Sequence, residues 1–181
     1  MAKLKIGVLY VVGTPIGNLR DFSPRAVETL TDADFIAAED TRVTRKLLTH
    51  FDIHTPMISY YEHNKMERGP EIVARIQNGE SCALVTDAGM PAISDPGQDL
   101  VDRCLRAGLP VVSVPGPTAF ATAVALSGMD STRFTFVGFL AVEKKKRREQ
   151  LDFIKKQTCT VVLYEAPHKL SATLQDLYAA L

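Results

Sequence analysis

The sequence predicts an α/β fold in which mostly parallel sheets are flanked by helices. Short apolar runs rich in Val, Ile, Phe and Tyr alternate along the chain with segments of helical period. Strands that alternate with helices form parallel sheets, and the early runs lack polar–apolar alternation, which is typical of strands buried on both faces. The expected strands are Val8–Val12, Phe35–Ala38, Met57–Ser59, Cys82–Thr86, Val111–Val114, Phe134–Gly138 and Thr160–Tyr164.

Seven helices are expected between and after these strands. Ser23 is an N-cap before Pro24, which is favoured in a first helical turn, and Gly79, Gly108 and Gly128 each follow a helical segment closely, as C-terminal caps do. The expected helices are Pro24–Thr31, Thr41–Phe51, Arg68–Gln77, Gln98–Arg106, Thr118–Ser127, Lys144–Lys156 and Lys169–Ala180.

Two prolines and a glycine at Pro115–Pro117 interrupt the pattern and predict a domain boundary there. We therefore expect an N-terminal α/β domain over residues 1–115 and a second one that starts at residue 116 and runs to 181. The chain stops inside the helical pattern Lys169–Leu181 with no cap and no closing strand, so we expect the second domain to be incomplete.

The composition is that of an ordinary globular protein. Hydrophobic residues make up 46% and charged residues 23% of 181 residues, which excludes general disorder. Lys+Arg and Asp+Glu are equal at 21 each, so any nucleic-acid-binding surface must be local.

The three cysteines have no metal-ligand spacing and are expected to be reduced, mostly buried thiols. No run reaches the roughly 18–20 apolar residues of a membrane helix, and Met1–Lys5 has no signal-peptide layout, so we expect a cytoplasmic protein without a metal.

Ligands of parallel sheets bind beyond the carboxyl ends of the strands, so the loops that follow the apolar runs are the candidate sites. Gly13–Asn18 contains two glycines that permit a close backbone approach, or simply a turn. Thr86–Gly97 combines two acids, two glycines, two prolines and small residues. Its Asp87 can accept a hydrogen bond from an amino group or a ribose hydroxyl, whereas Asp95–Gly97 is also common turn chemistry.

A third candidate loop, Pro115–Ala119, leads into an alanine-rich helix for which Thr118 is a plausible N-cap. Its alanines permit close packing of backbone or ligand, so both a hinge and a binding loop remain open.

Three segments carry cations or polar groups that can meet RNA, or that can simply be solvated. Arg42, Arg45 and Lys46 share one helix face, and His63 with Asn64 follows a strand. Five cations open the helix at Lys144–Arg148, where the helix dipole disfavours each by about 0.3–1 kcal/mol. The candidate RNA contacts are Arg45, Lys46, His63, Asn64, Lys144, Lys145, Arg147 and Arg148.

Five blocks in order make the sequence similar to a known family: Thr14–Leu19, Ala37–Arg42, His63–Asn64, Asp87–Gly89 with Asp95–Gly97, and Pro115–Pro117. They resemble the ribosomal RNA small subunit methyltransferase I family of the tetrapyrrole-methylase-like, class III methyltransferases. The resemblance covers essentially the whole chain. It implies S-adenosylmethionine (AdoMet)-dependent 2′-O-methylation of a cytidine in 16S rRNA, two α/β domains with AdoMet in the cleft between them, and a homodimer. Family members are longer, which again implies an incomplete second domain.

The resemblance also implies a set of site residues. The AdoMet contacts match Pro15, Asp87, Gly89, Ile93, Thr118, Ala119, Phe139 and Leu163. A ribose hydroxyl is a poor nucleophile, so a general base is expected; by position, Asp40 can accept the proton while Arg42 clamps a phosphate.

Three rival functions stay open from the sequence alone. A small-molecule, tetrapyrrole-type methyltransferase is disfavoured by the basic segments. An NAD-dependent enzyme is disfavoured because no GxGxxG motif is present. A noncatalytic RNA-binding module would bind RNA without binding AdoMet.

Overall fold

The computed structural model describes residues 7–181, so the expectations for Met1–Lys5 lie outside the described residues. The chain forms two compact units, one up to Thr118 and one of Ala119–Leu181. The domain boundary expected between residues 115 and 116 stays a prediction. Within residues 7–181, no helix combines the length and the apolar character needed to cross a bilayer.

The first unit is built on a five-stranded sheet with the order β3-β2-β4-β1-β5, and every pair of neighbours is parallel. All four residues of β2 and of β4 are buried, which confirms that the central strands are covered on both faces. The strands are β1 (Leu9–Val12), β2 (Phe35–Ala38), β3 (Met57–Ser59), β4 (Cys82–Val85) and β5 (Val111–Val114).

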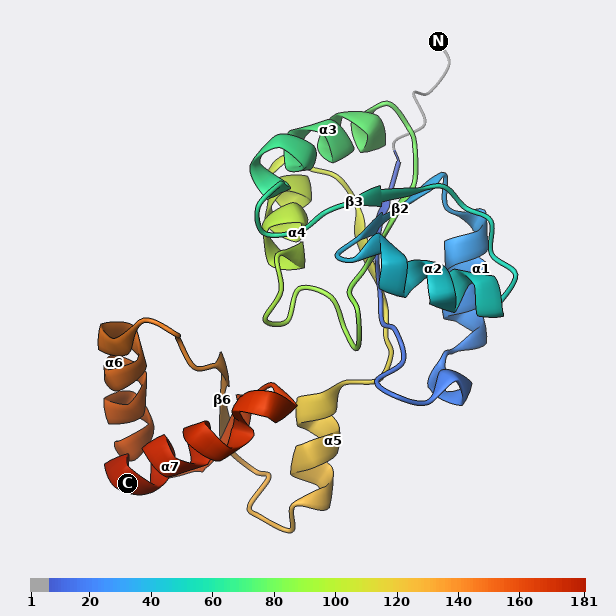
Figure 1. The fold of residues 1–181 in the computed structure, drawn as a ribbon. Helices are drawn as coiled ribbons and strands as arrows, with labels where there is room; N and C mark the ends of the chain where they lie inside the picture. Colours follow the sequence, from blue (N-terminus) through green and yellow to red (C-terminus); the bar gives the residue numbers. More distant parts are fainter. Residues whose placement is uncertain (1–6) are drawn as a thin grey trace. The chain divides into compact units, whose positions relative to one another are not determined.

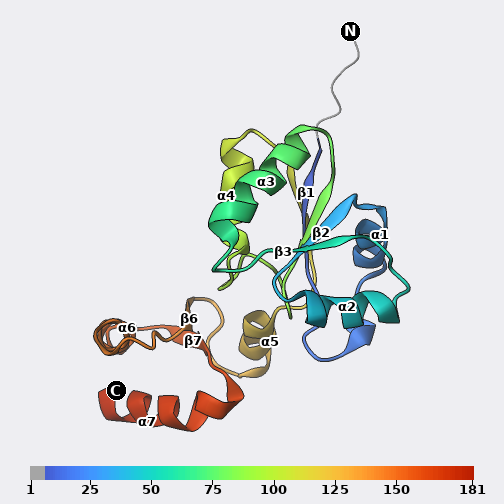
Figure 2. The same ribbon diagram turned by 45° about the horizontal axis from the view of Figure 1, so that its top comes forward.

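Helices cover both faces of this sheet (Figures 1 and 2). On one face, α1 (Pro24–Asp32) and α2 (Thr41–His50) bury Leu30 and Leu48 in a cluster with β-strand residues. On the other face, α3 (Lys65–Gln77) and α4 (Gly97–Arg106) bury Ile72 and Leu100 in a second cluster. The first unit therefore has one apolar core on each side of its sheet, as a parallel sheet requires.

Local signals set the helix ends. The Ser23 hydroxyl accepts from the amide of Ala26 at 3.1 Å, which confirms Ser23 as the N-cap of α1. Gly79 and Gly108 have φ values of 97° and 68° just beyond α3 and α4, a left-handed conformation that favours glycine at a helix end. A short 3-10 turn, Leu19–Asp21, precedes α1.

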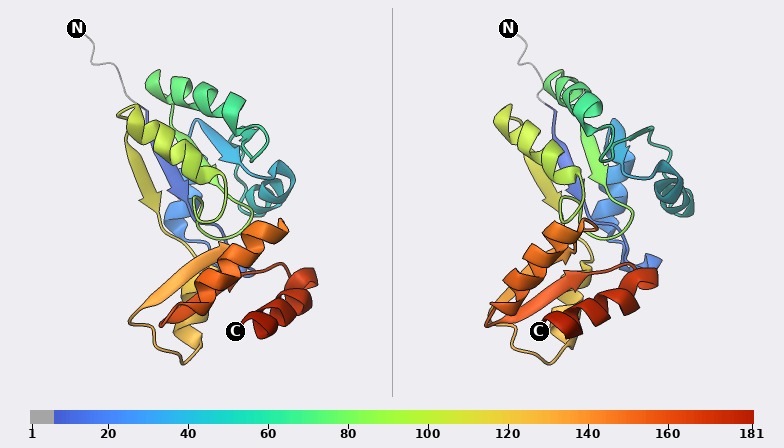
Figure 3. Two further views of the ribbon diagram at one scale, coloured as in Figure 1. Left: turned by 90° about the vertical axis from the view of Figure 1, so that its left-hand side faces the viewer. Right: turned by 60° about the vertical axis from the view of Figure 1, so that its left-hand side comes forward.

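The second unit contains a parallel pair of strands, β6 (Phe134–Phe139) and β7 (Thr160–Tyr164) (Figure 3). Its helices are α5 (Ala119–Leu126), α6 (Lys144–Lys155) and α7 (Leu170–Ala180), with a 3-10 turn at Pro167–Lys169. The rings of Phe120 and Phe136 stack at 4.7 Å between centroids. Large apolar residues remain exposed, including Leu126 at 80% and Tyr178 at 91%. Both units confirm the predicted α/β class with parallel strands.

Candidate functional site

The loops that follow β1 and β4 are joined at the carboxyl edge of the first sheet. The amide of Thr14 donates to the carbonyl of Gly89 (2.9 Å), and the amide of Gly89 donates to the carbonyl of Thr14 (3.1 Å). The buried Thr14 hydroxyl also donates to the carbonyl of Thr86 (3.1 Å). These hydrogen bonds therefore join the two loops into one surface beyond the carboxyl ends of β1 and β4.

Two glycines are required because a third loop approaches the first. A Cβ built on Gly13 would lie 2.7 Å from the Cα of Gly116, and one built on Gly116 would lie 2.9 Å from backbone atoms of Gly13. The amide of Gly116 also donates to the sulfur of Met90 (3.3 Å). At Gly13, the close approach that the sequence allowed is therefore made by another loop of the chain itself.

Asp95 organises the loop between β4 and α4. One carboxylate oxygen accepts from the amides of Ala92 (3.0 Å) and Gly97 (2.7 Å), and the other accepts from the amide of Ile93 (3.3 Å). Ala92 and Ser94 have φ values of 66° and 65°, which residues with a Cβ adopt at a cost. The turn expected at Asp95–Gly97 is thus a fixed conformation held by one side chain.

Glu39 lies at the end of β2 and faces the loop after β4. The hydroxyl of Thr86 donates to its carboxylate at 2.6 Å. Partial burial, followed by the nearby carboxylates of Asp87 and Asp95, raises the pKa of Glu39 above its ordinary value. Glu39 is not among the site residues predicted from the sequence, although its position directly after a buried strand was an available signal.

Asp40 caps α2 and pairs with Arg42. Its carboxylate accepts from the backbone amide of Arg42 (2.8 Å) and from the Arg42 guanidinium (2.6 Å). The hydrogen bonds from Arg42 lower the pKa of Asp40 to about 2. A carboxylate with so low a pKa is a weak proton acceptor, so the free structure favours a positioning role for Asp40.

Asp87 lies beside this pair. One of its carboxylate oxygens, Oδ1, accepts from the backbone amide of Asp40 at 3.1 Å. Partial burial and the neighbouring charge of Asp40 raise the pKa of Asp87, although the residue is exposed overall. Glu39, Asp40 and Asp87 are thus three adjacent carboxyl groups whose pKa values are moved in different directions by their surroundings.

A hollow of about 260 Å³, which we call the α2 pocket, opens on the side of α1 and α2. Four apolar side chains form its walls, namely Pro15, Leu19, Val43 and Leu47. Two charged side chains, Asp87 and Lys46, also line it. Apolar walls with a few polar groups are typical of small-molecule binding sites.

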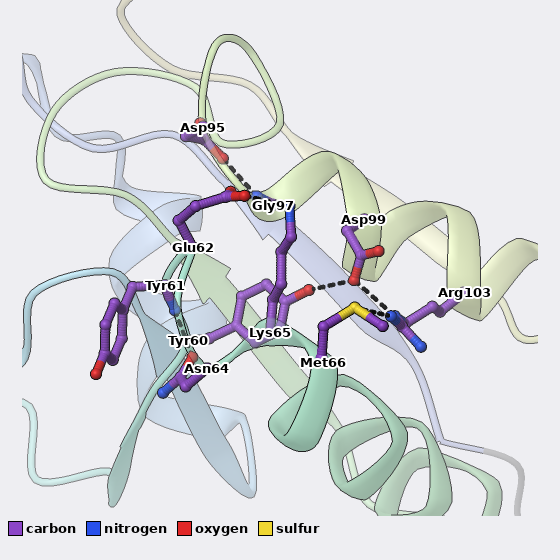
Figure 4. Close-up of polar contacts among 10 residues, drawn as sticks. All are labelled: Tyr60, Tyr61, Glu62, Asn64, Lys65, Met66, Asp95, Gly97, Asp99 and Arg103. Atoms are coloured by element: carbon purple, nitrogen blue, oxygen red, sulfur yellow. Dashed lines mark hydrogen bonds and ion pairs between the residues drawn. The ribbon is translucent and has the colours of Figure 1, made fainter.

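A wider hollow of about 840 Å³, the α4 groove, opens on the side of α3 and α4. Figure 4 shows the polar contacts around it: Lys65 pairs with Glu62 (2.7 Å), and the hydroxyl of the buried Tyr60 donates to Asp99 (2.8 Å). Asp99 also pairs with Arg103 (2.6 Å). Most charges of the α4 groove are therefore satisfied by neighbours. Within residues 7–181, no group of three or more His, Cys, Asp or Glu is arranged to hold a metal.

Comparison with known proteins identifies the family. The family model described as Tetrapyrrole (Corrin/Porphyrin) Methylases matches residues 8–181. A protein of Thermotoga maritima named ribosomal RNA small subunit methyltransferase I is 46% identical over 172 residues, covering 95% of this chain and 77% of that protein. The chain belongs to the ribosomal RNA small subunit methyltransferase I family, within the tetrapyrrole methylases.

Other relatives of the same name are more identical but longer. The Synechocystis protein is 53% identical over 172 residues, and the Bacillus subtilis protein is 47% identical over 175 residues. These matches cover 95% and 97% of this chain, but 62% and 60% of the relatives, so the chain spans about three fifths of their length.

Solved structures support the fold. A cobalt precorrin-4 methyltransferase superposes with a TM-score of 0.69 at 19% identity, over 99% of this chain and 77% of that one. A diphthine synthase also gives 0.69, at 15% identity over 96% and 71%. At such identities the likeness concerns the architecture alone, and it confirms the predicted class III methyltransferase fold.

Among the residues that the family resemblance assigns to AdoMet, the structure separates two groups in the first unit. Pro15 and Asp87 line the α2 pocket. Gly89 instead lies at the junction of the loops, where an added Cβ would face Ile16 and the carbonyl of Pro117 at 3.5 Å and 3.6 Å. Ile93 belongs to the turn held by Asp95, and Thr118 ends the first unit, its hydroxyl 3.4 Å from the carbonyl of Gly116.

The residues expected to contact RNA differ in their exposure and in their contacts with the rest of the chain. Lys46 lines the α2 pocket and Arg45 is exposed beside it. His63 is exposed, with its ring 6.1 Å from that of Tyr61. The side chain of Asn64 accepts from the amide of Tyr61 and donates to Ser59, so it holds the loop before α3.

In the second unit, Lys144, Lys145 and Arg148 are exposed on α6. Arg147 is engaged internally, because its guanidinium donates to Asp176 (2.7 Å) and Thr173 (2.8 Å) and so links α6 to α7. The side chains of Arg147 and Asn64 are both bound to other residues of the chain. This supports a role in positioning their elements more than direct binding of phosphate.

The remaining AdoMet candidates lie in the second unit. Ala119 begins α5, Leu163 lies within β7, and Phe139 at the end of β6 contacts the ring of Tyr164 at 5.4 Å. Phe139 lines a hollow of about 500 Å³ together with Glu165, which follows β7 as Glu39 follows β2. Glu165 was not predicted from the sequence; its carboxylate accepts from the hydroxyl of Thr173 at 2.6 Å.

Proposed function

We propose that the protein uses AdoMet to methylate the 2′-oxygen of a cytidine ribose in 16S rRNA of the small ribosomal subunit. The observation that carries this proposal is the 46–53% identity, over at least 95% of this chain, to relatives named ribosomal RNA small subunit methyltransferase I. We further propose that it acts in the cytoplasm as a homodimer.

The loops beyond the first sheet suit AdoMet chemically. AdoMet carries a cationic sulfonium and two ribose hydroxyls. A carboxylate without a cationic partner attracts the sulfonium charge and can accept hydrogen bonds from the hydroxyls. Glu39 has no ion pair within residues 7–181. We propose that AdoMet is held by Pro15, Asp87, Gly89, Ile93, Thr118, Ala119, Phe139 and Leu163.

AdoMet, when bound, supplies an electrophilic methyl group. The protein's own task is to align the ribose oxygen in line with that methyl group, and positioning alone can contribute roughly 7–11 kcal/mol in favourable systems. Arg42, whose side chain is 87% exposed, is suited to hold an RNA phosphate. Its departure from Asp40 would remove the side-chain hydrogen bond that lowers the pKa of Asp40 most, which would make that carboxylate a better proton acceptor.

The proposed RNA surface comprises Arg45, Lys46, His63, Asn64, Lys144, Lys145, Arg147 and Arg148. The exposed cations among them support phosphate binding directly. Arg147 and Asn64 support it through the elements that they hold in place.

The test uses full-length protein, labelled AdoMet and small ribosomal subunits. We expect label in the RNA and a block to alkaline cleavage after one cytidine, because a methylated 2′-oxygen cannot attack the adjacent phosphate. Label in a tetrapyrrole or in protein, with RNA cleavage unchanged, would overturn the proposal.

A second measurement tests the catalytic pair. Asp40→Asn, with unchanged thermal unfolding, should lose most methyl transfer if Asp40 accepts the proton. Full methyl transfer by this variant would exclude that role and leave Asp40 as the cap of α2.

A further inference from the structure

Glu39 differs from the other four carboxylates that line the α4 groove. Three of those four are ion-paired with a neighbouring cation, namely Glu62, Asp99 and Asp102. The fourth, Asp95, accepts from three backbone amides of its own loop. Glu39 forms no ion pair within residues 7–181, and its carboxylate accepts from the Thr86 hydroxyl at 2.6 Å. The ion pair or the turn that accounts for each of the other acids is therefore missing for Glu39 in the part of the chain that the structure describes.

The sheet places Glu39 beside the loop that carries a proposed AdoMet contact. Ala38 of β2 pairs in register with Val85 of β4. The next residues, Glu39 and Thr86, therefore leave the sheet at the same level, and their side chains are hydrogen-bonded. The residue after Thr86 is Asp87, which is proposed to hold AdoMet. Glu39 thus adjoins the proposed cofactor site, and it also lines a hollow of about 840 Å³, a size typical of ligand sites.

The α4 groove also offers cations to the phosphates of a nucleic acid. Lys65 and Arg106 line it, and each is paired with an exposed acid. Ion pairs between exposed groups are weak, so a phosphate can replace the acid as the partner of either cation. A nucleotide can therefore enter this groove and bring its ribose to Glu39.

We propose that Glu39 is the catalytic residue that accepts the proton of the ribose 2′-hydroxyl during methyl transfer. The inference rests on the proposed function. The 2′-oxygen forms a bond to the methyl carbon, the carbon–sulfur bond breaks with its electron pair on sulfur, and the hydroxyl proton passes to a carboxylate oxygen of Glu39. The sulfonium and the carboxylate lose their opposite charges in the same step, so the charges balance.

The surroundings of Glu39 suit a proton acceptor better than those of Asp40. Burial raises the pKa of Glu39 above its ordinary value, whereas hydrogen bonds from Arg42 lower the pKa of Asp40 to about 2. A general base works best when its pKa lies near the pH at which the enzyme operates. Asp40 becomes a stronger acceptor only after Arg42 has left it, whereas Glu39 has no such cation to lose. A carboxylate also has about four acceptor positions, so the bond from Thr86 leaves room for a substrate hydroxyl.

The decisive variant is Glu39→Gln. The glutamine oxygen can still accept from the Thr86 hydroxyl, but glutamine cannot take up the proton. The readout is the single-turnover rate of methyl transfer from full-length protein to small ribosomal subunits, with AdoMet and subunits both saturating. We expect the rate to fall by about 100-fold or more, because a positioned general base contributes roughly 10²–10⁴-fold. Glu28→Gln, on the exposed surface of α1, is the matched control and should keep the full rate.

A pH profile of the same rate separates a catalytic role from a structural one. The rate of the unaltered protein should fall at low pH as Glu39 becomes protonated, with an apparent pKa above the ordinary 4.5. Thr86→Val removes a hydrogen bond that favours the charged carboxylate, so the pKa of Glu39 should rise further and the fall in rate should move to higher pH. This second variant keeps Glu39 and tests the inference even if Glu39→Gln does not fold. The other charged groups near Glu39 are unchanged in both variants, namely Glu62, Lys65, Asp87, Asp95, Asp99, Asp102 and Arg106.

Three results would contradict one hypothesis or the other. A full single-turnover rate in Glu39→Gln at saturating AdoMet overturns the inference and leaves the proposed function intact, because the RNA is still methylated. Loss of the low-pH fall in rate in Asp40→Asn would assign the proton to Asp40 and also overturn the inference. Failure of the unaltered protein to methylate the RNA of small subunits would overturn the proposed function itself.

Discussion

Asp95 shows how much of the site depends on a single side chain. It satisfies three backbone amides of the loop between β4 and α4, in which Ala92 and Ser94 adopt left-handed backbone conformations. Asp95→Ala should lower the free energy of unfolding by about 2 kcal/mol, because hydrogen bonds to a charged acceptor contribute roughly 1.5–3 kcal/mol. Urea unfolding measures the change. Asp102→Ala, which removes a surface pair with Arg106, is the control and should cost less than about 1 kcal/mol; an equal effect of both variants would contradict the role of Asp95.

Glu39 should make the free energy of unfolding depend on pH, in a direction set by its raised pKa. Burial raises its pKa in the folded state above the ordinary 4.5, so its stabilising contribution is present at low pH and is lost as the pH rises through the folded pKa. Glu39→Gln should therefore match the unaltered protein near about pH 4 and become relatively more stable toward about pH 8. The gain should stay below about 1 kcal/mol, because solvent partly screens the carboxylate.

Thermal or urea unfolding at a series of pH values checks this prediction. Glu28→Gln, on the exposed surface of α1, controls for the loss of one acidic group. A stability difference between Glu39→Gln and the unaltered protein that does not change with pH would refute the assignment.

The contrast among Glu39, Asp40 and Asp87 also marks what the sequence cannot provide at this scale. Asp40 and Asp87 were predicted as site residues, and Glu39 has the same position directly after a buried strand. Their different pKa values come from partners far along the chain, since Thr86 and Asp87 lie 47 residues from Glu39 and Asp40. The choice of a proton acceptor therefore depends on tertiary contacts that no local pattern encodes.

At the scale of elements, the sequence predicted nearly all strands and helices, because burial on both faces produces continuous apolar runs. The first turn of α3 was missed, as the expected helix began at Arg68 and the observed one begins at Lys65. Its N-cap, Asn64, makes no side-chain bond to the helix and instead binds Tyr61 and Ser59. The usual capping signal is therefore absent at this helix start.

Under the proposed function, changes at the start of α6 should affect stability and RNA binding in opposite directions. Its N-cap, Glu143, makes no side-chain capping bond, and Lys144 and Lys145 lie in the first turn, where the helix dipole is positive. Changing both lysines to Glu should raise the free energy of unfolding by about 1 kcal/mol at low salt. The same double variant should bind RNA more weakly and show a smaller dependence of affinity on salt, because phosphate contacts are lost.

Urea unfolding and a salt series of RNA-binding curves test both effects. Lys156→Glu, at the opposite end of α6, is the control and should lower stability, since an anion is unfavourable at a helix C-terminus. Unchanged RNA affinity in the double variant would show that these lysines are solvated surface charges that do not contact RNA.

At the scale of the whole molecule, the sequence identified which loops carry the candidate site but not how they combine. The glycines of Gly13–Asn18 were expected to permit a close backbone approach or a turn, and it is Gly116 of another loop that approaches Gly13. The α2 pocket joins residues from the loop after β1, from α2 and from the loop after β4, and its charged residues Lys46 and Asp87 are 41 positions apart in the chain. Such a site arises from strand order, β2-β4-β1, which alternation of strands and helices does not determine.

The two units also differ in how well their strands are covered, which predicts unequal local stability. Ala37 and Leu84 are 0% and 2% exposed within a five-stranded sheet that has helices on both faces. Residues of β7 are all only partly buried, in a sheet of two strands. Small two-stranded sheets are marginal, and regions with few buried apolar contacts open more readily.

Amides of β6 and β7 should therefore exchange with deuterium at least about ten-fold faster than those of β2 and β4, a difference of about 1.4 kcal/mol in opening free energy. The edge strand β3, whose residues are also partly buried, is the internal control, because it shares the core of the first unit. If β3 is protected nearly as well as β4, an edge position is not what makes amides exchange fast. Fast exchange of β6 and β7 would then be a property of the second unit as a whole. Equal protection of β7 and β4 would show instead that residues 7–181 unfold as one cooperative block, and the marginal second sheet would then draw its stability from the rest of the chain.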